Sequence, residues 1–178
     1  MKRAFMKRMQ RPISIAILTL GMLALAALAG NIDNVRKWAW GTNAGWINFA
    51  PSAGGDTSYT ATVYADHLEG WIWGEASGWV RLGTHSGGGS YTYGNSSPSD
   101  YGVNRNSSTG ALSGYAWGSN VGWIKFNPSS GGVSIAADGS FQGYAWSESV
   151  GWISFKNSGA IPYNVAYASR TYLPLLQR

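Results

Sequence analysis

The chain contains no cysteine, so it has neither disulfide bonds nor metal sites built on thiolates. Charged residues are also scarce, because they make up only 12% of the sequence, about half of the usual share. No helical periodicity of apolar residues is found after residue 30. Glycine, in contrast, occurs 25 times, about twice its average frequency. These features are typical of a turn-rich β protein that is stabilised by packing alone.

The net charge of +5 comes from the N-terminal segment. Residues 1–29 have a basic head, an apolar run over residues 13–29 and a final Ala27-Leu28-Ala29, which together predict a secretory signal peptide. A retained membrane anchor is the alternative, although a spanning helix needs about 20 apolar residues. Five of the 13 basic residues and no acidic residue lie in this segment, so residues 30–178 are formally neutral. We therefore expect no nucleic-acid partner, and no membrane association after cleavage.

All 10 tryptophans belong to a phrase that occurs four times. Its copies are residues 36–49, 69–82, 113–126 and 142–155. They align without a gap on two tryptophans six residues apart: Trp40/Trp46, Trp73/Trp79, Trp117/Trp123 and Trp146/Trp152. Two positions before each pair stands another aromatic residue: Trp38, Trp71, Tyr115 or Tyr144. Such self-similarity indicates a repeat architecture.

Each copy is predicted to form a three-stranded antiparallel meander. In the fourth copy, alternating residues 133–135 precede the turn signal Asp138-Gly139, and residues 141–146 and 152–155 follow as the second and third strands. The two tryptophans of a copy then face each other across the second turn, where we expect them to form a buried structural core. Both faces of such a sheet are apolar, so it needs a neighbour on each side.

The sequence therefore predicts one all-β domain, residues 30–178, of four tandem three-stranded repeats arranged as a small propeller-like ring. A β-sandwich and a β-solenoid are the alternatives. The first copy lacks a leading strand, whereas an unassigned strand, residues 162–167, follows the last copy. We expect this C-terminal strand to close the ring, or else to pair with a neighbouring molecule. The Gly- and Ser-rich residues 83–101 are predicted to be an excursion loop.

The repeated phrase Gly-[Tyr/Trp]-[Ala/Ile]-Trp-x4-Gly-Trp-[Ile/Val]-x-[Phe/Leu] resembles a tryptophan-rich repeat of exported, mostly uncharacterised bacterial proteins. Lys37 departs from this pattern, since it replaces the glycine found at Gly70, Gly114 and Gly143. The resemblance implies a repeat architecture and a secreted or cell-surface location. It implies no catalytic residues.

Few polar residues are arranged for catalysis. His67 and His85 do not recur among the copies, and both are predicted to be solvated turn residues. Glu75 and Glu148 occupy equivalent turns, and a pair of carboxylates is what glycosidases use, but solvated turns are the simpler interpretation. We therefore expect no enzymatic activity, no cofactor and no metal ion.

Aromatic side chains are the remaining candidates for function. Tyr91, Tyr93 and Tyr101 belong to the excursion loop and are predicted to be exposed, with anchoring of the loop as the alternative. The candidate ligand-binding residues are these three and Trp38, Trp71, Tyr115 and Tyr144. The sequence thus predicts a secreted, non-catalytic binding or adhesion module for a glycan or another cell-surface polymer. The alternative is a structural subunit that self-assembles through its C-terminal strand.

Overall fold

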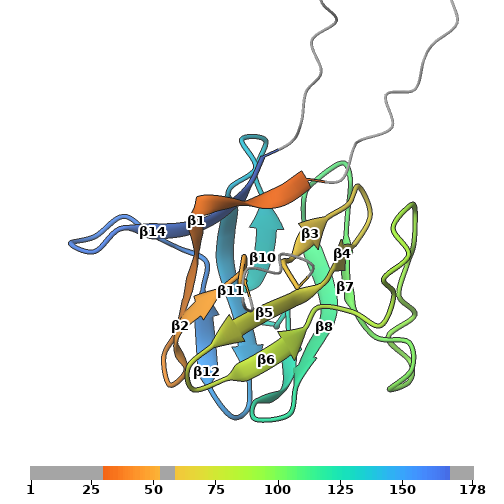
Figure 1. The fold of residues 1–178 in the computed structure, drawn as a ribbon, viewed down its shortest axis with the longest axis horizontal. Helices are drawn as coiled ribbons and strands as arrows, with labels where there is room; N and C mark the ends of the chain where they lie inside the picture. Colours follow the sequence, from red (N-terminus) through yellow and green to blue (C-terminus); the bar gives the residue numbers. More distant parts are fainter. Residues whose placement is uncertain (1–29, 53–58, 169–178) are drawn as a thin grey trace, which may run out of the picture.

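The computed structural model describes residues 30–52 and 59–168, and the predicted signal peptide lies outside them (Figure 1). The described residues form fourteen β-strands, which confirms the all-β prediction. Within these two ranges there is no helix of the length and apolar character needed to cross a bilayer.

Eight of the strands close into an antiparallel barrel. They form four hairpins: β1 (Gly30–Gly41) with β2 (Gly45–Asn48), β5 (Trp71–Gly74) with β6 (Gly78–Arg81), β8 (Leu112–Gly118) with β9 (Gly122–Lys125), and β11 (Phe141–Ser147) with β12 (Gly151–Ser154). Neighbouring hairpins pair through β2–β5, β6–β8 and β9–β11. Strand β12 then pairs with β1, where Trp40 lies opposite Ser154, and this pairing closes the barrel. Each copy of the repeated phrase therefore supplies one hairpin.

Six shorter strands surround the barrel: β3 (Thr62–Val63), β4 (Leu68–Glu69), β7 (Val103–Arg105), β10 (Gly132–Ile135), β13 (Lys156–Asn157) and β14 (Tyr163–Tyr167). Strands β7 and β10 pair with the first residues of β8 and β11, as expected for leading strands. Strand β3 pairs with β4, which comes just before β5.

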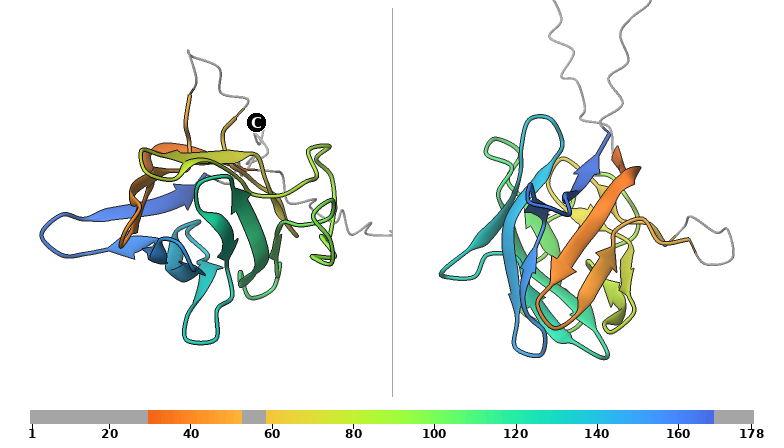
Figure 2. Two further views of the ribbon diagram at one scale, coloured as in Figure 1. Left: turned by 90° about the horizontal axis from the view of Figure 1, so that it is seen from below. Right: turned by 90° about the vertical axis from the view of Figure 1, so that its left-hand side faces the viewer.

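The C-terminal strand β14 supplies the leading strand that the first repeat lacks. It runs antiparallel to β1, with Ile32 opposite Tyr167 and Lys37 opposite Val165. Both views in Figure 2 show β14, in blue, beside the orange β1, so the two ends of the described chain meet. This is the position that the sequence predicts for closure within one chain.

Alternation along the strands selects small and aliphatic side chains for the barrel interior. The inward residues of the four hairpins are Ala39 and Ile47, Ile72 and Val80, Ala116 and Ile124, and Ala145 and Ile153, all buried. An eight-stranded barrel is just wide enough to be filled by such side chains. Residues of the hairpin turns fill one end of the interior: Ala44, Ser77, Val121 and Val150.

Phenylalanines dominate the other end of the core. Phe155 contacts Phe49, Phe126 and Phe141, with ring centroids 5.4, 5.8 and 5.9 Å apart. Leu82 holds the position of Phe49 in the second copy and is also fully buried. This cluster joins the barrel to the leading strands, because Val103, Val133 and Val165 are buried with it.

The predicted propeller-like ring is wrong in its arrangement, as are the alternative sandwich and solenoid. A propeller and a sandwich pack separate sheets face to face, and a solenoid stacks its repeats along an axis without closing. Here neighbouring hairpins continue one sheet by edge-to-edge hydrogen bonds until it closes on itself. Within residues 30–52 and 59–168, no second sheet lies above the apolar outer face. Closure into a barrel leaves that face as the surface of the molecule.

Candidate functional site

The paired tryptophans lie on the outside of the barrel, so the prediction that they form a buried core is wrong. Seven of the eight are between 36% and 42% exposed, and Trp152 is half-buried. The reason is steric: the interior accepts Ala145 or Ile153, and alternation then directs Trp146 and Trp152 outward.

Within each hairpin the two tryptophans are direct cross-strand partners. The ring centroids lie 4.9 Å apart for Trp40–Trp46, 4.8 Å for Trp117–Trp123 and 4.9 Å for Trp146–Trp152. Tilted or edge-to-face pairs at this separation contribute about 0.5–1.5 kcal/mol beyond the area that they bury. In these three hairpins the outward tryptophans therefore stabilise the strand pairing while keeping much of their surface in contact with solvent.

The aromatic residue two positions before each pair packs against the second tryptophan. Tyr115 lies 5.9 Å from Trp123, and Trp38 lies 6.2 Å from Trp46. The predicted ligand residues Trp38, Trp71 and Tyr115 are half-buried by these contacts, whereas Tyr144 is 50% exposed. All four lie on the outer face, each opposite one polar residue: Asn48, Arg81, Lys125 or Ser154.

These side chains form a continuous belt around the barrel. Where one hairpin meets the next, a polar residue lies opposite the first tryptophan of the neighbouring repeat: Asn48 opposite Trp73, Arg81 opposite Trp117, Lys125 opposite Trp146, and Ser154 opposite Trp40. We call the eight paired tryptophans and these four polar residues the tryptophan belt. It alternates flat apolar rings with hydrogen-bonding groups.

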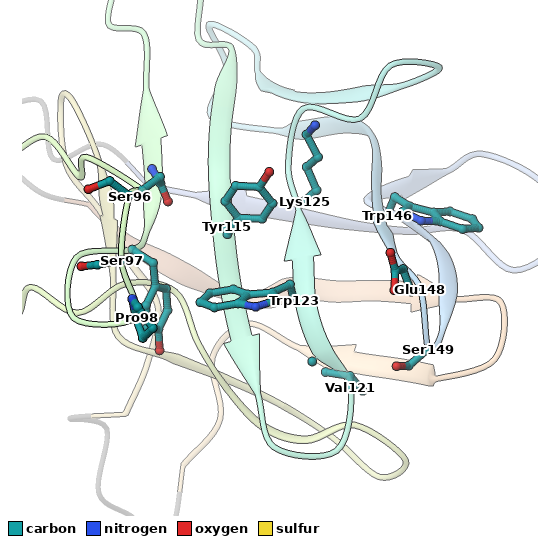
Figure 3. Close-up of a pocket in the computed structure, with 13 residues that line it drawn as sticks. Ser96, Ser97, Pro98, Tyr115, Val121, Trp123, Lys125, Trp146, Glu148 and Ser149 are labelled. Carbon is teal, nitrogen blue, oxygen red and sulfur yellow. The ribbon is translucent and has the colours of Figure 1, made fainter.

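The belt is hollowed where the third and fourth hairpins meet. A groove of about 640 Å³ lies there, within the range of ligand sites. Its lining residues are Asn95, Ser96, Ser97, Pro98, Tyr101, Tyr115, Val121, Gly122, Trp123, Lys125, Trp146, Glu148 and Ser149. Figure 3 shows Ser96, Ser97 and Pro98 on one side, Glu148 and Ser149 on the other, and the Trp123 indole between them. The Trp146 indole is directed away from Lys125, so Trp123 is the principal aromatic surface of the groove.

Trp123 is fixed in place by three other rings. Its centroid lies 4.9 Å from Tyr101, 4.8 Å from Trp117 and 5.9 Å from Tyr115. Trp123 nevertheless remains 42% exposed. A large side chain that is both exposed and held rigid loses little further conformational entropy when a ligand binds to it.

The tyrosines of the excursion loop do not form the predicted exposed surface. Tyr93 and Tyr101 are buried, and burial raises the pKa of both hydroxyl groups. The Tyr93 hydroxyl donates a 2.9 Å hydrogen bond to the Leu68 carbonyl oxygen, which anchors the loop to β4. Tyr91 is half-buried and stacks on His85 at 4.0 Å. The loop therefore packs against the barrel, and Tyr101 lines the groove although it is buried.

His67 also contradicts the expectation of a solvated turn. It is fully buried, and its ring lies between two carboxylates, with Nδ1 2.6 Å from Asp66 Oδ1 and Nε2 2.9 Å from Glu69 Oε1. His85 is half-buried and close to the same Glu69 oxygen, at 3.5 Å. The spacing His67-x-Glu69 was a usable signal, because residues two apart on a strand lie on one face.

Glu75 and Glu148 are both exposed turn residues, in agreement with the simpler interpretation. Glu148 lies in the groove, and it is the only carboxylate among the described residues that line it. The groove thus offers one carboxylate where glycoside hydrolysis needs two. Comparison with family models, curated proteins and solved structures finds no match for this chain.

Proposed function

We propose that this chain is a secreted, non-catalytic binding module that adheres to a glycan or another cell-surface polymer, with the groove beside Trp123 as the principal site and the rest of the tryptophan belt as a set of weaker contacts. The observation that carries the proposal is the outward, ordered placement of the paired tryptophans, beside a groove that offers both rings and polar groups. A monomeric soluble protein rarely exposes so much contiguous apolar surface unless that surface binds something.

The chemistry of the groove fits a sugar better than the other common ligands. A sugar ring has an apolar face of C–H groups, which suits a flat indole such as Trp123, and hydroxyl groups that need donors and acceptors around its edge. Lys125, Glu148 and Ser149 supply those groups at the rim. Nucleic acid is disfavoured, because residues 30–178 are formally neutral and provide no excess of positive charge for phosphates.

The repetition of the belt favours a polymer as the ligand. Each of the four junctions between hairpins places a polar residue opposite a tryptophan, so weak contacts can recur around the barrel. Several weak sites on one molecule bind a polymer much more tightly than any one of them binds a monomer. This property is what an adhesion module requires.

Self-assembly by strand donation is the second function that the sequence suggests. It requires β14 to detach from β1 of its own molecule and to pair with β1 of another molecule. The pairing of β14 with β1 inside one chain weighs against it, since that edge is already occupied. We therefore favour binding over assembly.

The test is retention of the mature protein on insoluble polysaccharides, such as cellulose, chitin and peptidoglycan, together with an array of soluble oligosaccharides. Trp123→Ala removes the main ring of the groove. Trp79→Ala is the matched control, because Trp79 occupies the same repeat position and is similarly exposed, 37% against 42%, but does not line the groove.

We expect retention on at least one polysaccharide, with Trp123→Ala weakening it by about tenfold or more and Trp79→Ala changing it much less. Loss of one stacking ring of this size is worth about 1–3 kcal/mol. The proposal fails if no glycan retains the protein, or if both variants bind as tightly as the parent protein.

A further inference from the structure

The excursion loop brings a second histidine to a buried histidine and a buried glutamate. His67 lies just before β4, Glu69 lies at its end, and His85 comes from the loop that follows β6. His67 Nε2 is 2.9 Å and His85 Nε2 is 3.5 Å from the same oxygen, Glu69 Oε1. One ligand atom from each of the three residues lies within 4.8 Å of the other two. Two imidazole nitrogens and a carboxylate thus lie close together, and His85 Nε2 also lies 3.1 Å from the Gly88 carbonyl oxygen.

Neighbouring groups hold these three side chains in orientation. Asp66 Oδ1 accepts a hydrogen bond from His67 Nδ1 at 2.6 Å, which leaves Nε2 to face the cluster. Ser90 in turn donates to the other oxygen of Asp66. A carboxylate that binds the far nitrogen of a histidine is the usual outer partner of a metal-ligating imidazole. The residues behind the cluster therefore match those of a metal centre.

Aromatic rings enclose both imidazoles. Tyr64 stacks on His67 with centroids 4.6 Å apart, and Tyr91 stacks on His85 at 4.0 Å. The backbone N–H of Gly88 donates to Glu69 Oε1 at 2.9 Å, so the loop also fixes the glutamate. The His85 side chain keeps 27% of its surface exposed, which leaves a path for an ion and a water molecule from that side.

The charge of the cluster is compatible with a bound cation. Asp66 and Glu69 bring two carboxylates together, and neither forms an ion pair with a lysine or arginine within residues 30–52 and 59–168. Glu69 is buried, whereas Asp66 keeps 26% of its side chain exposed, and both contact His67, which carries at most one positive charge. A buried carboxylate needs a compensating charge. A divalent cation bound between the imidazoles and Glu69 would supply it at the point where the ligand atoms converge.

We propose that His67, Glu69 and His85 bind a zinc ion, with water as the fourth ligand. Two imidazoles and one carboxylate suit zinc, whereas calcium and magnesium prefer oxygen ligands alone. Zinc bonds of about 2.0–2.1 Å place tetrahedral ligand atoms about 3.4 Å apart. Two of the three separations, 2.9 and 3.5 Å, are close to that value, and the two histidine ligand atoms lie within 4.8 Å of each other. Binding replaces the contact between His67 Nε2 and Glu69 Oε1 with bonds from both atoms to zinc, and it ties the excursion loop to β4.

The loop that zinc would fix also forms one wall of the groove, through residues 95–98. The metal site does not depend on the proposed glycan binding, and each can fail without the other.

Titration of the mature protein with zinc chloride, after dialysis against a chelator, tests the site by calorimetry. We expect one equivalent to bind, and His85→Gln to weaken binding by a factor of at least about ten. Glu75→Gln is the control, because Glu75 lies in an exposed turn and its loss should leave zinc binding unchanged. Zinc, but not magnesium, should also raise the thermal midpoint of the parent protein.

A second measurement needs no variant. Cobalt(II) in place of zinc should give the visible absorption bands of a tetrahedral ion with nitrogen and oxygen ligands. The proposal is overturned if zinc does not bind at one equivalent, if His85→Gln binds as tightly as the parent protein, or if cobalt shows only the weak spectrum of its hydrated ion.

Discussion

Glycines at two positions of the repeat are predicted to differ sharply in their tolerance of alanine. Gly143 and Gly151 both have positive φ angles, +90° and +73°. Gly151 ends the three-residue turn of the β11–β12 hairpin, and a Cβ there would come no closer than 3.7 Å to any neighbour. A Cβ on Gly143 would lie far inside van der Waals contact with the Gly132 carbonyl oxygen of β10.

The magnitudes follow from these two surroundings. Alanine with a left-handed backbone costs about 1–2 kcal/mol, so Gly151→Ala should lower the free energy of unfolding by about that amount. Gly143→Ala carries the same backbone cost and also overpacks the β10–β11 contact, which adds about 1–3 kcal/mol. The entropy that alanine removes from the unfolded chain is similar in both variants and cancels in their comparison.

Lys37 shows how the chain avoids this requirement in its first repeat. It holds the position of Gly143, but its φ is not positive, since Asn95 is the only non-glycine residue with a positive φ in residues 30–52 and 59–168. The pairing of β1 with β14 shifts register between Ile32 and Lys37. The strand is irregular there, so a side chain fits.

Urea unfolding followed by tryptophan fluorescence measures both variants, provided that the dependence on urea concentration is unchanged. Gly143→Ala should be the less stable of the two by about 1–3 kcal/mol, or should fail to fold. If Gly143→Ala loses no more free energy of unfolding than Gly151→Ala does, the close approach of β10 to β11 is refuted.

Three further predictions concern the core, an ionisable tyrosine and the C-terminal strand. Phe126→Ala should cost about 3–5 kcal/mol in urea unfolding, because Phe126 is fully buried against Phe155. Burial raises the pKa of Tyr93 in the folded state, so its contribution to stability is complete below the unfolded pKa of about 10 and declines as pH rises above it. Tyr93→Phe should therefore flatten the loss of stability above pH 10 in the same assay. Deletion of residues 156–178 removes β14 with its buried Val165 and Ala166, so circular dichroism and light scattering should show loss of the folded monomer, and a peptide of residues 156–168 should restore it.

Much of the fold could be predicted from local patterns. The two-residue alternation around Tyr144 and Trp146 and the turn at Asp138-Gly139 were sufficient to place strands β10, β11 and β12. The missing leading strand of the first repeat and the extra strand at the end indicated where β14 lies. These features depend on neighbouring residues and on the number of strands in each repeat, and both can be read from the sequence.

The direction in which the tryptophans point could not be predicted in the same way. Alternation places Ala145 and Trp146 on opposite faces of the sheet, but it does not determine which face is directed to the interior. That choice depends on the space inside a closed eight-stranded barrel, which admits Ala145 and Ile153 but not eight indoles. The regularly spaced alanine and isoleucine positions indicated the inward face, but the tryptophans are the larger and more frequent signal in each repeat.

The groove and the histidine cluster depend on contacts between distant segments. Residues 95–98 line the groove beside Trp123, in a loop that Tyr93 anchors to Leu68 of β4, 25 residues away in sequence. His85 approaches Glu69 through the same loop. Nothing in the repeated phrase encodes this loop, which occurs in a single copy.

The most direct test of the tryptophan belt as a binding surface is oxidative footprinting of the folded protein, with each tryptophan followed by peptide mass spectrometry. Without ligand, seven of the eight paired tryptophans should be oxidised, including Trp123 and Trp79, because each of the seven keeps more than a third of its surface exposed. When a polysaccharide that retains the protein is added, Trp123 should be protected from oxidation much more strongly than Trp79. Tryptophans that resist oxidation until the protein unfolds, or a Trp123 that the polysaccharide leaves unprotected, would contradict the account.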